Sequence, residues 1–348
     1  MTRSEQTKLI RFMNTLSVVI SAFNEEAKIK DCLESVKGMS SEIVFVDNLS
    51  LDKTREIARK YTDKILTRKN NLMLNVNKNY GFSKATGDWI LSLDADERVT
   101  PELKEEIRNV INNKATRTRH SGEERSDDSR IPKHDERFWA SQNDEKRING
   151  FWIPRKNIIF GKWIQHSIWW PDYQLRLFRR DKGRFPEKHV HEYIRVEGKT
   201  EKLQHPLEHL NYSTVSQFIY KMDKIYTESE VEKIIASGKI LTWIDAIRFP
   251  VNDFLKTFFA EKGYKDGLHG LVLSILQSLY AEVVFAKVWE RQGFKEENNP
   301  HFLKDIYKEC KEIIREFHYW TITSFLETSY HPLKRLFYKT LRKFRKSV

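Results

Sequence analysis

The sequence predicts an α/β fold with a largely parallel central sheet, followed by a helical C-terminal region. Between residues 16 and 96, short runs rich in Val and Ile alternate with amphipathic segments rich in Leu, Ala, Lys and Glu, which is typical of strand-helix-strand units. Three of the apolar runs end in polar residues, and ligands of open α/β sheets bind beyond the carboxyl ends of the strands. The chain has 348 residues, 39% of them hydrophobic, so it can form a sizeable core.

The expected elements follow this alternation in order. Strands are predicted at residues 16–23, 42–48, 63–68 and 88–96, and helices at 24–38 and 51–61. The residues that follow, up to Ala85, are interpreted as a polar segment. A helix is predicted to begin at Pro101, because Thr100 followed by Pro and Glu suits a helix start.

Beyond residue 113 the composition changes twice. Residues 114–149 are dense in charge and poor in aliphatic side chains, so we interpret them as a disordered insert. Residues 150–213 are rich in aromatics and turn signals, which favours short strands and loops, and helices are expected from about residue 214. The apolar stretch 267–281 has fifteen uncharged residues, fewer than the roughly 20 that span a bilayer, so a buried or interfacial helix is expected there.

The formal net charge of +12 indicates an anionic partner. Composition alone does not distinguish among nucleic acid, phospholipid and phosphorylated substrates. The last sixteen residues carry seven Lys or Arg and no acid, with apolar side chains at helical spacing. This pattern fits either a helix on an anionic membrane or a solvated helix docked on the protein itself. Two distant cysteines, Cys32 and Cys310, suggest neither a disulfide framework nor a zinc site, and no signal-peptide core begins the chain, so a cytoplasmic protein is expected.

The stretch DWILSLDADE at residues 88–97 carries the strongest chemical signal. Side chains at i and i+2 of a strand share one face, so Asp94 and Asp96 are expected to lie side by side where this strand ends. Two carboxylates with open positions left over suit Mg²⁺ or Mn²⁺ shared with the phosphates of a substrate. A calcium-binding EF-hand loop is disfavoured, because Val99 stands where that loop needs Gly. Helix capping near Thr100 does not account for the paired aspartates.

Five motifs together resemble those of glycosyltransferase family 2: SVVISAFNEE, VFVDNLSLDKT, NKNYGFSKATGDWILSLDADE, WWPDYQLRLF and HVHEYI. Within this family the sequence is most similar to the lipopolysaccharide inner-core β-1,4-glucosyltransferases, over residues 16–113 and 150–290. The resemblance implies a GT-A (Rossmann-like) fold, a UDP-sugar donor, Mg²⁺ or Mn²⁺, and inversion at the anomeric carbon. It also implies a nucleotide-sugar-binding half at 1–113, an acceptor half at 150–213, and a helical, membrane-associated region at 214–348.

The family's donor-site roles are carried over to the residues that match its motifs. The resemblance implies that the nucleotide is bound by Ser21, Phe23, Asn24 and Glu25, and its uracil ring by Asp47. It also implies that Lys78 and Asn79 lie near the phosphates or ribose of the donor. Finally, it implies that Asp94 contacts the ribose and the metal shell and that Asp96 is a direct metal ligand. Structural alternatives stay open: a helix cap by Asn24, an ordinary turn at Asp47, and a surface position for Lys78. Asp52 is interpreted as structural, and Leu49 stands where the family commonly has Gly.

On the acceptor side, the resemblance and the chemistry of inversion call for a base. Asp172 is the candidate, with a pKa expected to be raised by surrounding aromatics, and Glu192 is the second candidate. The sugar is expected to stack on one or more of Trp169, Trp170 and Tyr173, unless the tryptophans are core residues. From the pair His189 and His191, His191 is a candidate metal ligand, and charge on the leaving diphosphate is expected to be stabilised by Arg176 and Arg179.

The sequence therefore predicts an inverting hexosyltransferase. Its expected donor is UDP-glucose, its acceptor a lipid-linked envelope saccharide such as the lipopolysaccharide inner core, and its location the cytoplasmic face of the inner membrane, bound peripherally to an anionic surface. The alternatives are a polyprenyl-phosphate sugar transferase and a non-catalytic binder of nucleotide sugars or nucleic acid. Nucleic acid is not expected, because charge is the sole feature favouring it. Dinucleotide-dependent oxidoreduction is not expected either, because no G-x-G-x-x-G motif follows the first strand and no P-loop is present.

Overall fold

The computed structural model describes residues 14–70, 74–113, 147–187, 192–296 and 298–346. Contacts group the chain into two units, the first made of Met1–Asn157 and Asp172–Asn211 and the second of Ile158–Pro171 and Tyr212–Val348. Most of the insert predicted at 114–149 lies outside the described residues, but Ile148 and Asn149 already belong to a strand.

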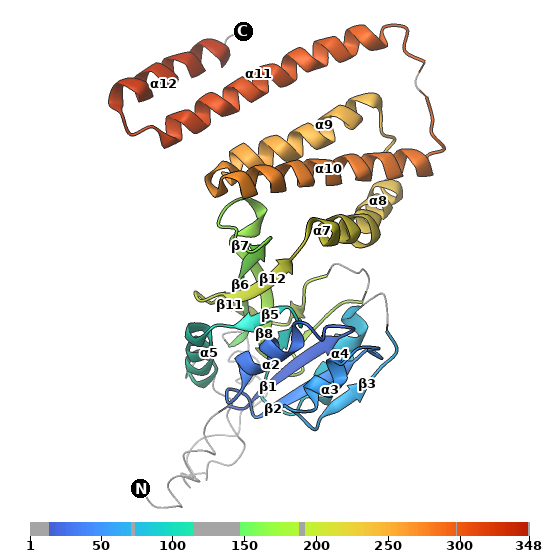
Figure 1. Cartoon of the computed structure of the whole chain (residues 1–348), viewed down its shortest axis with the longest axis vertical. Helices are drawn as coiled ribbons and strands as arrows, with labels where there is room; N and C mark the ends of the chain where they lie inside the picture. The colour runs from blue at the N-terminus through green and yellow to red at the C-terminus, as the bar shows by residue number, and fades with distance from the viewer. Residues whose placement is uncertain (1–13, 71–73, 114–146, 188–191, 297, 347–348) are drawn as a thin grey trace, which may run out of the picture. The chain divides into compact units, whose positions relative to one another are not determined.

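A mixed sheet forms the centre of the first unit (Figure 1). Its strands follow the order β3-β2-β1-β4-β8-β6-β12-β5, and β11 and β7 also pair with β6. The bounds are β1 Leu16–Ala22, β2 Glu42–Asp47, β3 Ile65–Thr67, β4 Trp89–Leu93, β5 Glu97–Val99, β6 Ile148–Ile159, β7 Lys162–Trp163, β8 Asp172–Arg179, β11 Lys199–Lys202 and β12 Leu207–Tyr212, with a separate pair β9 Gly183–Arg184 and β10 Arg195–Val196. The four strands β1 to β4 pair in parallel, whereas β8 is antiparallel to both β4 and β6. The predicted α/β fold with a largely parallel sheet is confirmed.

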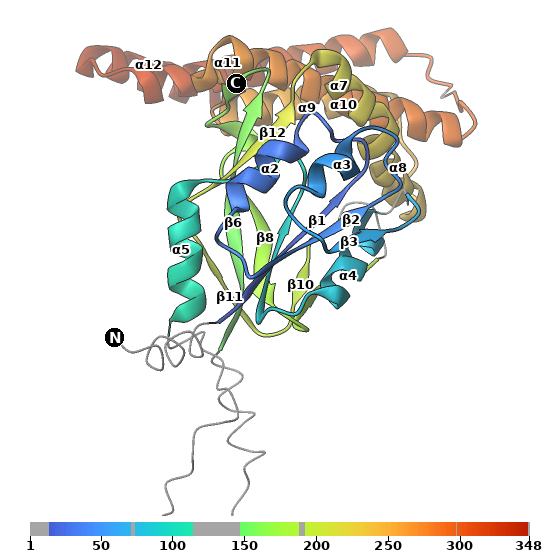
Figure 2. The ribbon, with the colours of Figure 1, turned by 60° about the horizontal axis from the view of Figure 1, so that its bottom comes forward.

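Helices cover both faces of this sheet, because apolar side chains alternate along its strands. On β1, Val18 and Ile20 pack with the buried faces of α2 (Ile29–Val36) and α5 (Pro101–Asn112), while Val19 packs with Phe82 of α4 (Leu74–Lys84). Figure 2 shows α5 beside the strands and α4 near β2 and β3. A short helix, α3 (Thr54–Ala58), contributes Ala58 to the core that contains α2. The carboxyl ends of β1, β2 and β4 are left to carry polar groups.

Two elements differ from the sequence expectation. Helix α4 lies where a polar segment was predicted, and the reason is that its buried positions include Asn75, Asn77 and Lys78 rather than an apolar stripe. Strand β5 follows the predicted strand end directly and pairs with β12. The predicted cap at Thr100 is confirmed, because its hydroxyl accepts a hydrogen bond from Leu103 N at 3.2 Å.

The turn after β2 explains the unusual Leu49. This residue has φ 62°, in the left-handed region that favours glycine, and its side chain is half exposed. Neighbouring bonds hold the turn, since Asp47 Oδ1 accepts from Ser50 N at 3.2 Å and Asn24 Oδ1 accepts from Leu51 N at 2.8 Å. A leucine therefore adopts here the backbone conformation that glycine would adopt without strain.

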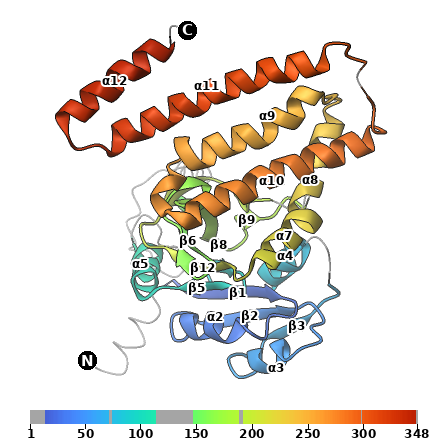
Figure 3. The same ribbon diagram turned by 45° about the horizontal axis from the view of Figure 1, so that its top comes forward.

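Helices dominate the second unit (Figure 3). They are α7 Val215–Lys221, the π-helical η2 Met222–Tyr226, α8 Thr227–Ala236, α9 Trp243–Phe254, the π-helical η3 Leu255–Ala260, the 3-10 turn η4 Gly263–Asp266, α10 Leu268–Arg291, α11 Phe302–Thr328 and α12 Pro332–Lys346, with a further 3-10 turn η1 at Ser167–Trp169. Helix α10 packs against α8 and α9, and α11 contacts α12 and η3. By length and composition α10 is the one described helix that meets the criteria for a membrane span, with mean hydropathy 1.6, although core helices meet the same criteria. It extends ten residues beyond the predicted 267–281 stretch.

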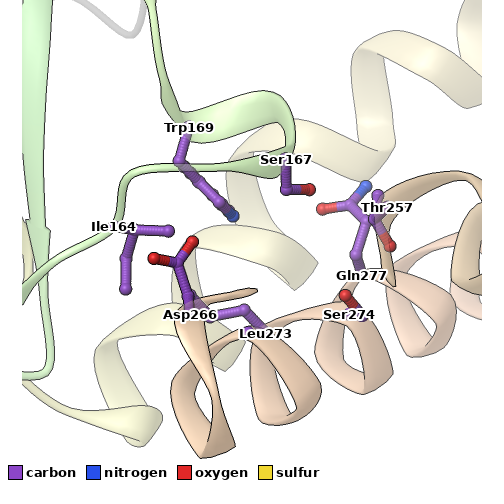
Figure 4. Close-up of a pocket in the computed structure, with 9 residues that line it drawn as sticks. Ile164, Ser167, Trp169, Thr257, Asp266, Leu273, Ser274 and Gln277 are labelled. Carbon is purple, nitrogen blue, oxygen red and sulfur yellow. The ribbon is translucent and has the colours of Figure 1, made fainter. Parts of the chain in front are cut away.

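The second unit contains a small polar cluster around Asp266 (Figure 4). Its buried carboxylate accepts hydrogen bonds from the backbone N–H groups of Gln165 and His166, at 3.1 and 2.9 Å. The gap between Ile164, Trp169, Leu273 and their neighbours has no room for a water molecule. This cluster therefore fastens the segment 158–171 to the helices and is not a ligand site.

Glu42 ties together the opposite, amino-terminal edge of the sheet. Its carboxylate accepts hydrogen bonds from Lys64 Nζ at 2.7 Å, Ser17 Oγ at 2.5 Å and both the backbone and the hydroxyl of Thr86. Burial alone would raise the pKa of Glu42, but these donors outweigh burial and lower the pKa to about 2. The folded protein therefore stabilises the ionised form of Glu42 more than the unfolded chain does.

We expect this carboxylate to make the free energy of unfolding depend on acid pH. Because the folded-state pKa is depressed, the stabilisation is fully present above the unfolded pKa of about 4.5 and is lost as pH falls from there towards 2. Urea denaturation at several pH values should therefore give a shallower decline in this range for Glu42→Gln than for the wild type. Glu56→Gln, which removes an exposed carboxylate of α3, controls for the loss of one charge. Equal slopes for wild type and Glu42→Gln would contradict the assignment.

Candidate active site

A tight turn follows β4 and separates the two aspartates of the DAD sequence. Strand β4 ends at Leu93, and the turn is closed by a hydrogen bond from Glu97 N to Asp94 O at 2.9 Å. The Glu97 carboxylate in turn accepts a hydrogen bond from Asp94 N, also at 2.9 Å. The expectation that Asp94 and Asp96 lie side by side on one strand face is therefore wrong, because the chain leaves the strand before Asp94 and their carboxylates have different partners.

Asp94 lies between two cations. Its Oδ1 forms an ion pair with Lys78 Nζ, and its Oδ2 accepts a hydrogen bond from Arg176 Nη2 at 2.5 Å. Burial alone would raise the pKa of Asp94, but Arg176 and Lys78 hold it well below its usual range. The Asp94 side chain keeps 30% of its surface exposed, whereas those of Lys78 and Arg176 keep 10% and 6%.

Glu97 lies beneath Asp94 and is completely buried. It accepts a hydrogen bond from Arg176 Nη2 at 2.6 Å, and Arg155 Nη1 lies 3.7 Å from the same oxygen. A buried carboxylate is stable only when paired and hydrogen-bonded, which is the arrangement here. Burial would lower the pKa of Arg176, but Asp94 and Glu97 raise it instead, so the guanidinium stays charged.

Arg176 reaches this position through an irregularity in β8. Phe151 of β6 pairs with Leu177, whereas the next residue, Trp152, pairs with Leu175, so Arg176 is the extra residue of a β-bulge. Such bulges redirect side chains next to functional sites. The antiparallel pairing of β8 with β4 sets Leu177 opposite Leu91 and so brings the bulge towards the end of β4.

Asp96 has a different environment. Its Oδ2 lies 3.7 Å from His209 Nε2 and 3.9 Å from Lys28 Nζ. The other ring nitrogen of His209, Nδ1, is 2.6 Å from Asn157 Oδ1. Within the described residues, no group of three or more His, Cys, Asp or Glu side chains is placed to share one ion. A carboxylate and an imidazole nitrogen here face one another as two potential ligands of one ion.

Asp172 begins β8 and is held by polar neighbours rather than by aromatics. Arg155 donates to its Oδ2 through Nε at 2.8 Å and Nη2 at 2.5 Å, Asn157 Nδ2 donates at 3.2 Å, and Gln174 Nε2 donates to Oδ1 at 2.8 Å. Burial alone would raise the pKa of Asp172, but Arg155 and the two amides lower it. The expected raised pKa is therefore wrong, and the carboxylate is ionised.

The residues matched to nucleotide binding lie around the ends of β1 and β2. Ser21 Oγ accepts a hydrogen bond from Asn48 Nδ2 at 3.1 Å, Phe23 is half-buried, and Glu25 N donates to Thr54 Oγ1 at 2.7 Å. Asn24 does not cap α2, which begins at Ile29 after Lys28, but holds the turn that contains Leu49. Asp47 is 1% exposed and also belongs to that turn, as the structural alternative proposed. Asp52 is structural as expected, because it accepts hydrogen bonds from the backbone of Glu26 and Thr54.

On α4, the adjacent residues Lys78 and Asn79 contact different parts of the protein. Lys78 is 8% exposed and paired with Asp94, so the surface alternative is wrong for this lysine. Asn79 donates to Phe185 O at 2.9 Å and to Glu187 Oε1 at 2.6 Å, and its oxygen accepts from Phe185 N. Asn79 therefore fixes the segment after β9 with both ends of its amide.

Of the remaining predicted residues, Arg179 is not brought to this site. The Arg179 guanidinium lies 4.9 Å from the Trp89 ring, at the opposite end of β4, because β8 runs antiparallel to β4. Trp169 and Trp170 belong to the second unit, where Trp169 packs edge-on against Tyr212. Tyr173 lies on β8, and the Nζ atom of Lys202 lies 4.2 Å from the centroid of its ring. Glu192 is half-buried between β9 and β10, while His189 and His191 lie outside the described residues.

Four residues at this site have no counterpart in the sequence prediction: Glu97, Arg155, Asn157 and His209. Glu97 was visible as the third carboxylate of the DADE sequence. Arg155 and Asn157 alternate on β6, so polar residues at i and i+2 within an aromatic strand were the available signal. His209 had no comparable signal, since the strand LEHLNY alternates as an ordinary half-buried strand does.

Together these residues form one buried charge network, referred to here as the β4–β8 network and consisting of Lys78, Asp94, Glu97, Arg176, Arg155 and Asp172. Three cations alternate with three carboxylates along it. In a site of low dielectric, such fixed cations stabilise negative charge on a neighbouring ligand without needing to reorganise. The arrangement suits a reaction in which negative charge develops on a bound phosphate group while an ionised carboxylate accepts a proton.

Comparisons with known proteins identify the family of the chain. The sequence profile of glycosyl transferase family 2 matches residues 17–194. A lipopolysaccharide core biosynthesis glycosyltransferase, LpsC of Rhizobium meliloti, is 25% identical over 292 residues, covering 82% of this chain and 95% of that protein. An uncharacterized glycosyltransferase of Rickettsia prowazekii is 24% identical over 76% of this chain and 83% of its own length. Among solved structures, glucosyl-3-phosphoglycerate synthase from Mycobacterium tuberculosis with Mn²⁺ and UDP-glucose is 22% identical, with a TM-score of 0.23 over 24% of this chain and 34% of that one.

Removing Arg176 should destabilise the fold far more than removing Lys78. Arg176→Met leaves the fully buried Glu97 without its 2.6 Å partner, and breaking a buried pair costs about 3–5 kcal/mol of unfolding free energy. Lys78→Met leaves Asp94, whose side chain is 30% exposed and keeps Arg176, so a loss of about 1 kcal/mol is expected. Urea denaturation at neutral pH measures both. Equal small losses for the two variants would contradict the role given to the Arg176–Glu97 pair.

Proposed function

Because the chain belongs to glycosyl transferase family 2 and has the GT-A fold, we propose that it transfers a hexose, with inversion, from a nucleotide sugar to a saccharide acceptor. The donor we infer is UDP-glucose, and the acceptor is a lipid-linked saccharide of the lipopolysaccharide core. The acceptor class is supported by the similarity to LpsC, which extends over 95% of that protein.

The observation that best supports this proposal is that two cations, Lys78 and Arg176, contact the Asp94 carboxylate. When the bond between the anomeric carbon and the donor phosphate breaks, negative charge grows on the departing diphosphate. Lys78 and Arg176 are held at the end of β4 by the ionised Asp94, so their charge is in place before the reaction begins. The role of Asp94 is then to position these two cations.

A divalent cation fits the remaining donor atoms. Asp96 offers a carboxylate oxygen 3.7 Å from the Nε2 atom of His209, and a carboxylate oxygen and an imidazole nitrogen are donors that would hold a divalent cation. A bound Mg²⁺ or Mn²⁺ would neutralise charge on the diphosphate. We therefore assign Asp96 and His209 as the described ligands, and His191 stays a prediction because it lies outside the described residues.

Asp172 is the proposed base. It is ionised, and its 21% exposed side chain keeps access to an acceptor hydroxyl. Arg155, Asn157 and Gln174 fix the carboxylate so that it can take the proton as the hydroxyl attacks the anomeric carbon. Glu192 is the second candidate for this task.

We also propose that the protein lies on the cytoplasmic face of the inner membrane, bound through α12. This helix has seven Lys or Arg and no acidic residue, and Leu333, Leu336 and Phe337 expose 71%, 63% and 60% of their surfaces. Cationic helices with an exposed apolar stripe bind anionic bilayers, with about 1 kcal/mol for each basic side chain near the surface. Nothing in this helix requires a nucleic acid.

Donor turnover tests the proposed activity directly. Purified protein is incubated with UDP-, GDP- and dTDP-sugars in the presence of Mn²⁺, Mg²⁺ or EDTA, and release of nucleoside diphosphate is measured. We expect metal-dependent release from UDP-glucose, reduced by at least about a hundredfold in Asp96→Asn because the metal loses its carboxylate ligand. Asp88→Asn, at the other end of β4, is the matched control and should keep wild-type turnover.

The pattern of failure is informative. Binding of a donor without turnover would favour a non-catalytic nucleotide-sugar binder, and turnover with polyprenyl phosphate as acceptor would favour the corresponding lipid-phosphate transferase. Absence of donor binding with either metal would overturn the proposed function.

Membrane binding through α12 is tested with vesicles. We expect the protein to float with phosphatidylcholine vesicles that contain phosphatidylglycerol and not with phosphatidylcholine alone. Replacing Lys334, Arg335 and Lys339 together by Gln removes about 3 kcal/mol of attraction, or roughly a hundredfold in partitioning. Replacing Lys304, Lys308 and Lys311 of α11 by Gln removes the same charge from a helix that also carries five acids, and should change partitioning little. An equal effect of both triple variants would show attraction by net charge alone.

A further inference from the structure

Asn157 lies between the proposed base and the proposed metal ligand. It is completely buried on β6, where its Nδ2 donates to Asp172 Oδ2 at 3.2 Å and its Oδ1 faces His209 Nδ1 at 2.6 Å. Asn211 Nδ2 donates to the same Oδ1 at 3.4 Å. One amide therefore contacts both halves of the site.

The orientation of this amide follows from chemistry. The ionised Asp172 can only accept hydrogen bonds, so the group that faces it is the NH₂ of Asn157. The oxygen consequently faces His209, which agrees with the additional donor from Asn211. The alternative orientation would set an oxygen against a carboxylate and an NH₂ against an NH₂, and both pairings are unfavourable.

This orientation fixes which ring nitrogen of His209 is occupied. Because Asn157 Oδ1 accepts, Nδ1 carries a proton and donates it, and Nε2 is the ring nitrogen that faces Asp96 Oδ2, 3.7 Å away. With Nδ1 engaged by Asn157, Nε2 is the nitrogen placed to bind a cation beside Asp96, whose Oδ2 also lies 3.9 Å from Lys28 Nζ. Metal-binding histidines are usually oriented in this way, by a hydrogen bond from the ring nitrogen that does not bind the metal.

We propose that Asn157 is a positioning residue that prepares both sides of the reaction: its oxygen holds His209 with Nε2 available to a divalent cation, and its NH₂ holds the Asp172 carboxylate. This inference rests on the proposed function for the roles of Asp172 and the metal. The contacts that carry it are independent of those roles. The two halves of one amide thus have separable effects.

Two substitutions of Asn157 separate these effects, and Mn²⁺ alone is the probe. Asn157→Leu removes both the acceptor and the donor, so we expect Mn²⁺ affinity of the full chain, measured by electron paramagnetic resonance without donor sugar, to fall by about tenfold or more. Asn157→Asp keeps an acceptor for His209 Nδ1–H but removes the donor to Asp172, so its Mn²⁺ affinity should stay within about threefold of the wild type while UDP-glucose turnover falls.

Asn211→Leu is the matched control, because Asn211 is also buried beside the same oxygen but contacts the amide at 3.4 Å and leaves the His209 bond in place. Its Mn²⁺ affinity should match that of the wild type. Thermal unfolding establishes that each variant folds, and Asn157→Ala replaces the leucine variant if the latter does not.

The outcomes distinguish this inference from the proposed function. Equal loss of Mn²⁺ affinity in the Leu and Asp variants, or no loss in the Leu variant, would overturn the positioning role while leaving the transferase activity intact. Wild-type protein that binds Mn²⁺ but turns over no donor would overturn the proposed function, and the affinity pattern would still decide the role of Asn157. Wild-type protein that binds no Mn²⁺ would overturn both the metal site and this inference.

Discussion

The buried ion pair between Glu97 and Arg176 is the constraint on which the rest of the site depends. Glu97 is wholly inaccessible to water, and a carboxylate in that position requires a partner with full charge and good geometry. The partner comes from a strand 79 residues further along the chain, and it arrives only because β8 pairs antiparallel with β4 and bulges at Arg176. The pairing of strands and the chemistry of the site are therefore satisfied by the same contact.

That contact also separates the tasks of the two aspartates. Arg176 bridges Glu97 and Asp94, so Asp94 is committed to cations of the protein itself. Asp96, two residues further along the chain, lies outside the β4–β8 network and faces His209 and Lys28. Two identical side chains two residues apart thereby acquire different partners, which is why we propose that one holds positive charge and the other offers a ligand. Side-chain type and spacing are the same for both, and the partners make the difference.

Local pattern allowed the sequence to predict strands β1 to β4, the Thr100 cap and the carboxyl-end location of the polar residues, because each depends on neighbours in the chain. The errors arose where distant partners decide. Helix α4 was missed because its buried side chains, Asn77 and Lys78, are polar and meet partners such as Asn48 and Asp94 from other elements. The pKa of Asp172 was predicted in the wrong direction because its neighbours in sequence are aromatic, whereas its neighbours in space are Arg155 and two amides.

Distant partners also explain why the site residues of β6, Arg155 and Asn157, were not predicted from the sequence. This strand lies between β8 and β12, so its residues reach Asp172 on one side and His209 on the other. Arg155 connects Asp172 to Glu97, and Asn157 connects Asp172 to His209. The proposed base on β8 and the proposed metal ligand on β12 are both held by residues of β6, so they are fixed relative to each other more firmly than loops would allow. For the proposed reaction, in which attack and departure take place on opposite sides of one carbon, such a rigid separation is the property that the fold has to supply.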